Sequence, residues 1–158
     1  MRRVQMACVL AVILAAGVGP SAQGRSGDRG NSRKTRPCTN ETLRGTYGIQ
    51  VQGTQPSGPG GPIESVIGVV MRDYDGLGQF TQVSNVKGSI NGWVPDRVGG
   101  GTYVVGADCT AVVHFQPAPG IVIEERLVIV DDGREVRSAT VLPLPVMATG
   151  VARRVHRD

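Results

Sequence analysis

Two cysteines provide the first chemistry that the sequence predicts. Cys38 and Cys109 remain as an even pair once the N-terminal apolar run that contains Cys8 is removed. In an oxidising compartment such a pair is most simply a disulfide bond. The chain has no Cys-x-x-Cys motif, and only His114 lies near either cysteine, so the spacing favours neither a redox motif nor a metal site. We therefore predict a structural disulfide between Cys38 and Cys109.

Four further side chains are predicted to bind a ligand: Trp93, His114, Glu124 and Arg126. His114 lies in an alternating strand, where it is either a surface residue or, if its face points inward, a ligand contact or general base. Glu124 and Arg126 share one face of their strand and form either an ion pair outside or a polar anchor inside a pocket. Trp93 lies in a long loop and either plugs one end of the fold or forms a binding lip. These residues form no catalytic motif, so no catalytic residue is assigned.

Two glycine-containing segments have alternative interpretations as ligand loops. Residues 73–78 begin like a calcium loop, but Leu77 occupies the fifth position and Ser84 the twelfth, where oxygen ligands are needed. Residues 99–101 have no following Lys-Ser or Lys-Thr and no helix that could bind a phosphate. We interpret the first segment as a hairpin turn and the second as a bulge or a tight corner. The sequence predicts no metal and no cofactor.

The N-terminus has the composition of a secretory signal peptide. Arg2 and Arg3 precede the uncharged apolar run 6–18, which is too short to cross a bilayer comfortably. The small-x-small sequence 22–24 follows as a cleavage site. We expect residues 1–24 to be removed and the protein to be exported to the periplasm or the extracellular space. An uncleaved N-terminal anchor is the alternative.

Residues 25–36 are predicted to be a disordered basic linker. They contain five basic residues, one acidic residue and no apolar side chain, so they cannot bury enough surface to fold. Besides spacing, we expect this linker to make weak contact with an anionic envelope surface. Residues 37–158 contain ten basic and twelve acidic residues. The folded part is thus near neutral, and we expect no nucleic-acid partner.

Residues 37–158 are predicted to form a single all-β domain. Apolar and polar residues alternate in short runs that are separated by clusters of Gly, Pro, Asn and Asp. The expected strands comprise residues 45–53, 64–73, 78–88, 100–105, 109–116, 121–130, 134–141 and 147–155. The strand at 64–73 is apolar on both faces, so we expect both of its faces to be covered.

Short turns join most of these strands, whereas residues 55–62 and 91–99 are expected to form longer loops. Tight turns between consecutive strands favour antiparallel pairing in sequence order. Closing such a meander removes two exposed edges, and eight strands enclose an interior that side chains fill or that holds one small ligand. We predict an antiparallel up-and-down barrel of about eight strands, with a two-sheet β-sandwich as the alternative.

Three segments resemble a group of small exported bacterial proteins without an assigned function. They are residues 38–48 (CTNETLRGTYG), 73–80 (DYDGLGQF) and 101–110 (GTYVVGADCT). The resemblance implies a β-barrel similar to the allene oxide cyclase, dirigent and lipocalin-like barrels. The catalytic residues of allene oxide cyclase match no motif of this sequence, so the resemblance implies no catalytic residue.

From these features we expect an exported, non-enzymatic barrel that binds a small apolar ligand or an envelope component. Few large aromatic residues are available to fill the interior. We therefore expect an apolar cavity that opens at the end bearing residues 55–62 or 91–99. The alternatives are a structural or interaction protein with a filled core, and a barrel isomerase or cyclase acting on a hydrophobic substrate.

Overall fold

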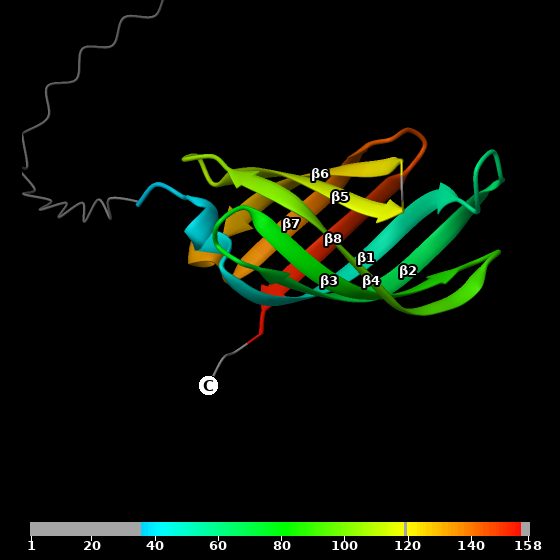
Figure 1. The fold of residues 1–158 in the computed structure, drawn as a ribbon, viewed down its shortest axis with the longest axis horizontal. Helices are drawn as coiled ribbons and strands as arrows, with labels where there is room; N and C mark the ends of the chain where they lie inside the picture. Colours follow the sequence, from blue (N-terminus) through cyan, green and yellow to red (C-terminus); the bar gives the residue numbers. More distant parts are fainter. Residues whose placement is uncertain (1–35, 119, 156–158) are drawn as a thin grey trace, which may run out of the picture. The chain divides into compact units, whose positions relative to one another are not determined.

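Eight antiparallel strands close into a barrel, in which each strand pairs with its neighbours in sequence and β1 pairs with β8 (Figure 1). The computed structural model describes residues 36–118 and 120–155. The predicted signal peptide (1–24) and residues 25–35 of the predicted linker lie outside this range. The strands are β1 (Gly45–Pro56), β2 (Ile63–Tyr74), β3 (Gln79–Gly88), β4 (Gly92–Val105), β5 (Thr110–Ala118), β6 (Ile121–Val130), β7 (Glu135–Leu142) and β8 (Met147–Arg154). The predicted barrel is confirmed, and the sandwich alternative is wrong.

The outer face of β2 corrects one expectation. Ile67, Val69 and Met71 lie on this face, and Ile67 is 63% exposed. The inner face of the same strand carries the buried Val70 and Tyr74. A barrel made of a single layer buries only one face of each strand, whatever the composition of the other face. The expectation that both faces of this strand are covered is therefore wrong.

Strand β4 begins earlier than the sequence predicts. Residues 92–99, expected in a loop, belong to β4 and pair with β3. The register shifts between Ser84 and Val86 of β3, so the segment of β4 that contains Pro95 bulges out of the ladder. Asp96 takes up this irregularity with a φ of 50°. A bulge lets a strand contain a proline without losing its pairing on either side, and the expected long loop is wrong.

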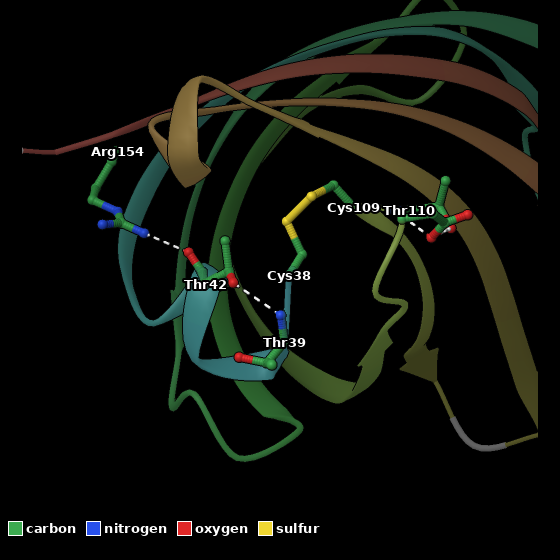
Figure 2. The surroundings of a disulfide bond; sticks show 7 residues. Cys38, Thr39, Thr42, Cys109, Thr110 and Arg154 are labelled. Carbon is green, nitrogen blue, oxygen red and sulfur yellow. Dashed lines mark hydrogen bonds between the residues drawn. A yellow bond between two sulfur atoms is a disulfide. The ribbon is translucent and has the colours of Figure 1, made fainter. Parts of the chain in front are cut away.

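One end of the barrel is covered by the 3-10 helix η1 (Asn40–Leu43), beneath which Leu43 is completely buried. A disulfide joins Cys38, just before η1, to Cys109, the residue just before β5, with 5.0 Å between their Cα atoms (Figure 2). The predicted disulfide is thus confirmed. Disulfides persist in oxidising compartments, so this one suggests an exported environment.

Arg154, on the last strand, connects η1 to the barrel. Arg154 of β8 donates a hydrogen bond of 2.7 Å from Nη2 to the carbonyl oxygen of Thr42 (Figure 2). The same guanidinium donates to the hydroxyl of Tyr47 on β1, which donates in turn to the carbonyl of Gly133 in the 3-10 helix η2 (Asp131–Gly133). We call this end of the barrel, with η1, η2 and the turns 75–78 and 106–109, the closed end. The opposite end, with residues 57–62, 89–91 and 143–146, is the far end.

Candidate functional site

The barrel interior contains a cavity of about 120 Å³ between the closed end and the far end. Its apolar lining consists of Ile49, Val51, Val70, Val86, Leu127, Val136, Ala148 and Ala152. Its polar lining includes Arg72, Tyr74, Gln82, Ser84, Glu125, Ser138, Thr140 and Thr149. The walls thus come from β1, β2 and β3 on one side and from β6, β7 and β8 on the other. The expected interior cavity exists, but its lining is more polar than the sequence predicts.

An ion pair between Arg72 and Glu125 borders this cavity. Arg72 Nη1 is 3.0 Å from Glu125 Oε2, and Arg72 Nη2 is 3.4 Å from Glu125 Oε1. The Arg72 side chain is 5% exposed and that of Glu125 17%. The two strands that carry these residues are not neighbours in the barrel. The pair therefore crosses the interior and connects opposite walls.

The remaining contacts of Arg72 fix its guanidinium in place. Its Nε donates to Gln82 Oε1 at 2.8 Å, and Nη1 donates to the hydroxyl of Tyr74 at 3.2 Å. The ring of Phe80 lies with its centroid 4.4 Å from the guanidinium carbon. Burial alone would lower the pKa of Arg72, but the Glu125 carboxylate raises it above its ordinary value. Arg72 is thus a permanently charged, rigidly held group.

Strand alternation explains why both charged residues point inward. Arg72 occupies the same face of β2 as the buried Val70 and Tyr74. Glu125 occupies the same face of β6 as the buried Leu127. The polar pair predicted from the sequence was Glu124 with Arg126, on the other face of β6, and did not include Arg72 or Glu125. The sequence feature that could have identified them is a charged residue on the same face of its strand as the buried apolar residues.

An aromatic cluster forms the floor of the cavity toward the closed end. Tyr74 lies at its centre, with its ring centroid 5.5 Å from that of Tyr47, 5.7 Å from that of Phe80 and 4.9 Å from that of Tyr103. Burial raises the pKa of Tyr47 and of Tyr74, and it raises the pKa of Tyr103 to about 12. These hydroxyls therefore stay protonated at neutral pH and serve as hydrogen-bonding groups.

At the far end, Glu64 holds two connections together. The residue is 1% exposed. Its carboxylate accepts hydrogen bonds from the amide nitrogens of Ile90 and Asn91, from Asn91 Nδ2 and from Gln55 Nε2. The bonds from Asn91 and Gln55 lower the pKa of Glu64, so the carboxylate stays ionised. Its acceptor positions are used within the chain, so we assign it to the architecture of the rim.

The four predicted ligand-binding residues lie away from the cavity lining. His114 is 51% exposed on β5, and its Nε2 is 3.2 Å from Glu124 Oε2. Arg126 Nη2 is 2.7 Å from Glu124 Oε1 on the outer face of β6. Trp93 is 58% exposed on β4, next to the far end. The structure thus brings His114, Glu124 and Arg126 together outside the barrel, and the ligand-binding role of all four remains a prediction.

Among residues 36–118 and 120–155, no group of three His, Cys, Asp or Glu side chains is placed to hold a metal ion. No helix of the same part of the chain is long and apolar enough to cross a membrane.

Comparison with known proteins adds one weak likeness. No protein-family model matches the chain, and no curated protein matches it. A solved structure, Rv2717c from M. tuberculosis, has 15% sequence identity with this chain, covers 73% of it and 94% of its own chain, and has a TM-score of 0.37. A likeness at this level carries no inference about activity.

Proposed function

We propose that this protein is an exported, non-enzymatic barrel that binds a small, largely apolar molecule in its interior cavity. The observation that carries the proposal is the cavity of about 120 Å³ between the aromatic floor and the far end. An apolar cavity of about 150 Å³ engineered into another protein binds benzene. The cavity of this barrel is slightly smaller, so it suits a molecule no larger than benzene or a close relative of it.

The chemistry of the lining supports binding rather than catalysis. Arg72 and Tyr74 both have pKa values raised above their ordinary, already high values. Acid–base catalysts work best with a pKa near the operating pH. These two groups are instead suited to orienting a bound molecule.

Two features support the exported location, periplasmic or extracellular. The Cys38–Cys109 disulfide requires oxidising conditions to persist. The N-terminal sequence has the charged, apolar and small-residue segments of a signal peptide. Mass spectrometry of the exported protein should give a mature N-terminus near Gln23 or Arg25.

Binding is tested by filling the cavity. Toluene and phenol are titrated into the protein while chemical shifts of backbone amides and the melting temperature are recorded. We expect saturable shifts at residues that line the cavity and a rise in melting temperature, because a ligand that binds only the native state stabilises it.

The variant Ala148→Leu places three extra carbon atoms in the cavity and should abolish binding. Ala139→Leu makes the same change on the exposed face of β7 and should leave binding intact. If neither probe binds the unmodified protein saturably, or if both variants bind alike, the proposed function is wrong.

A further inference from the structure

We infer that the molecule bound in the barrel is neutral and carries a hydroxyl group, which the Arg72–Glu125 pair holds. This inference rests on the proposed function and specifies the class of ligand. Both residues line the cavity, and both are largely buried. Their head groups are therefore the strongest hydrogen-bonding groups that an entering molecule meets.

The charges of the pair decide the charge of the ligand. The guanidinium of Arg72 and the carboxylate of Glu125 neutralise each other within hydrogen-bonding distance. A charged ligand would add a third charge to a site that is shielded from water, and an unpaired buried charge is costly. A neutral ligand keeps the existing pair intact, so the site favours neutral molecules.

The hydrogen-bonding capacity of the pair decides the polar group. A guanidinium has five N–H donors and a carboxylate has about four acceptor positions. In the described structure, Arg72 directs one donor to Gln82, one to Tyr74 and two to Glu125, which leaves one hydrogen on Nη2. The Glu125 oxygens accept one bond each from Arg72 and keep further acceptor positions. A hydroxyl is the smallest neutral group that can donate to Glu125 and accept from Arg72 at once.

The neighbouring lining adds further hydroxyl groups beside the ion pair. Thr140 pairs with Glu125 across β6 and β7, and Ser138 lies two residues further along the same inward face. These hydroxyls continue the polar side of the cavity. Aliphatic groups, among them Val51 on β1 and Val70 on β2, line the cavity between these polar groups. The site thus fits a small alcohol or phenol with an apolar body of about six carbon atoms, the size indicated by the benzene-binding cavity.

Phenol and toluene test this inference because they differ only by a hydroxyl in place of a methyl group. We expect the unmodified protein to bind phenol about tenfold more tightly than toluene, the effect of one hydrogen bond to a charged group. Benzoate, which is charged, should bind more weakly than phenol. In Glu125→Gln the Arg72 charge is uncompensated, so the preference should reverse in favour of benzoate.

A second variant removes both charges together. Arg72→Met with Glu125→Leu leaves neither partner unpaired, and its affinities for phenol and toluene should be equal within about twofold because no charged hydrogen bond remains. Glu135→Gln, which removes a carboxylate that pairs with Arg137 and Arg153 on the outer face, is the matched control and should keep the phenol preference.

The outcomes separate the two proposals. If toluene binds as tightly as phenol, or benzoate more tightly than phenol, to the unmodified protein, the hydroxyl inference is overturned and the proposed function stands. If no probe binds, the proposed function itself fails. If the double variant does not fold, nuclear Overhauser contacts between the phenol ring and methyl groups of the unmodified protein locate the ligand. Contacts to the Val70 methyl groups would support the inference, and contacts only to exposed methyl groups would overturn it.

Discussion

We call the part of the barrel between the aromatic cluster and the far end, where the cavity lies, the cavity half. Residues alternate between inward and outward positions along the strands in both the closed end and the cavity half, yet the closed end is packed and the cavity half is hollow. At the closed end, Tyr47, Tyr74, Phe80 and Tyr103 fill the interior with rings, and Leu43 of η1 covers them. Ring pairs at these distances add to the stability gained from burial alone. The closed end is therefore the rigid core of the domain.

In the cavity half, the inward-facing positions of the same strands carry smaller side chains. Ser84, Ser138, Ala148 and Gly150 all line the cavity. Small residues on facing strands leave space that the backbone of a closed barrel cannot collapse to remove, and the Arg72–Glu125 pair partly fills it. Side-chain size along each strand, rather than strand number, thus decides which part of an eight-stranded interior is filled.

The two halves can be followed separately by spectroscopy. The chain has three tyrosines and one tryptophan. All three tyrosines lie in the closed-end cluster, whereas Trp93 lies on β4 beside the far end. Tyrosine absorbance therefore reports on the packed half, and tryptophan fluorescence reports on the far end.

The largest effect is expected from removing a ring of the closed end. Tyr103 is 1% exposed and contacts Tyr74. Tyr103→Ala should lower the free energy of unfolding by about 3–5 kcal/mol, as for other large aromatic truncations in cores. Val86→Ala in the cavity half should cost at most about 1.5 kcal/mol, at about 0.8 kcal/mol per buried methylene, because Val86 is only half-buried. Urea unfolding measures both, and equal losses would show that the two halves are equally packed.

The second effect comes from the disulfide, which fastens only the closed end. Cys38→Ser with Cys109→Ser opens a loop whose ends are 71 residues apart in sequence. Loss of a native disulfide costs about 2–4 kcal/mol. We also expect the tyrosine signal to change at lower urea concentration than the fluorescence of Trp93. Chemical reduction of the unmodified protein is the control and should give the same loss; two free thiols in the native exported protein would contradict the bond.

Alkaline pH should act on the closed end before the cavity half. Burial raises the pKa of all three tyrosines above the ordinary value of 10.0, and that of Tyr103 to about 12. A group with a raised pKa in the folded state contributes stability that is complete below its unfolded pKa and is lost as pH rises through the folded pKa. Stability should therefore fall between about pH 10 and 12, in step with tyrosinate absorbance. Ionisation of all three tyrosines at pH 10 with unchanged stability would contradict the packing of this cluster.

Much of the closed end could be predicted from the sequence. Cys38 and Cys109 were recognisable as a pair by counting, and the inward phase of Tyr47 was recognisable from alternation in its strand. Both depend on local pattern or on simple arithmetic. The same local reasoning placed Pro95 in a loop, and this prediction was wrong. A bulge that keeps a proline inside a strand depends on the partner strand and not on the neighbouring residues in the sequence.

The cavity could be predicted only in part. Few large aromatics in the sequence favoured a space in the interior, but no local pattern shows that Arg72 meets Glu125, because the two residues are 53 positions apart and meet only when the barrel closes. The adjacent acids Glu124 and Glu125 illustrate the difficulty. Alternation puts them on opposite faces of the strand. Glu125 is the inward one, because it lies two residues from the buried Leu127. The opposite charges of Glu124 and Arg126 instead favoured the outward pair as the predicted site.

The smallest effect is expected from the outer face of the cavity half, and it sharpens the contrast between these adjacent acids. The Glu124 side chain is itself only 15% exposed, but it accepts from Arg126 at 2.7 Å and lies 3.2 Å from His114, and these two partners are 58% and 51% exposed, so both ion pairs reach the solvent. Exposed ion pairs contribute about 0–1 kcal/mol and are screened by salt. Glu124→Gln should therefore cost at most about 1 kcal/mol in urea unfolding, less still at high salt, whereas removing one partner of a buried pair, as in Glu125→Gln, typically costs about 3–5 kcal/mol. Toluene and phenol titrations of Glu124→Gln should match those of the unmodified protein. Loss of binding in this variant would instead place the ligand at His114, Glu124 and Arg126, as the sequence alone predicts, and would move the site from the inside of the barrel to its outside.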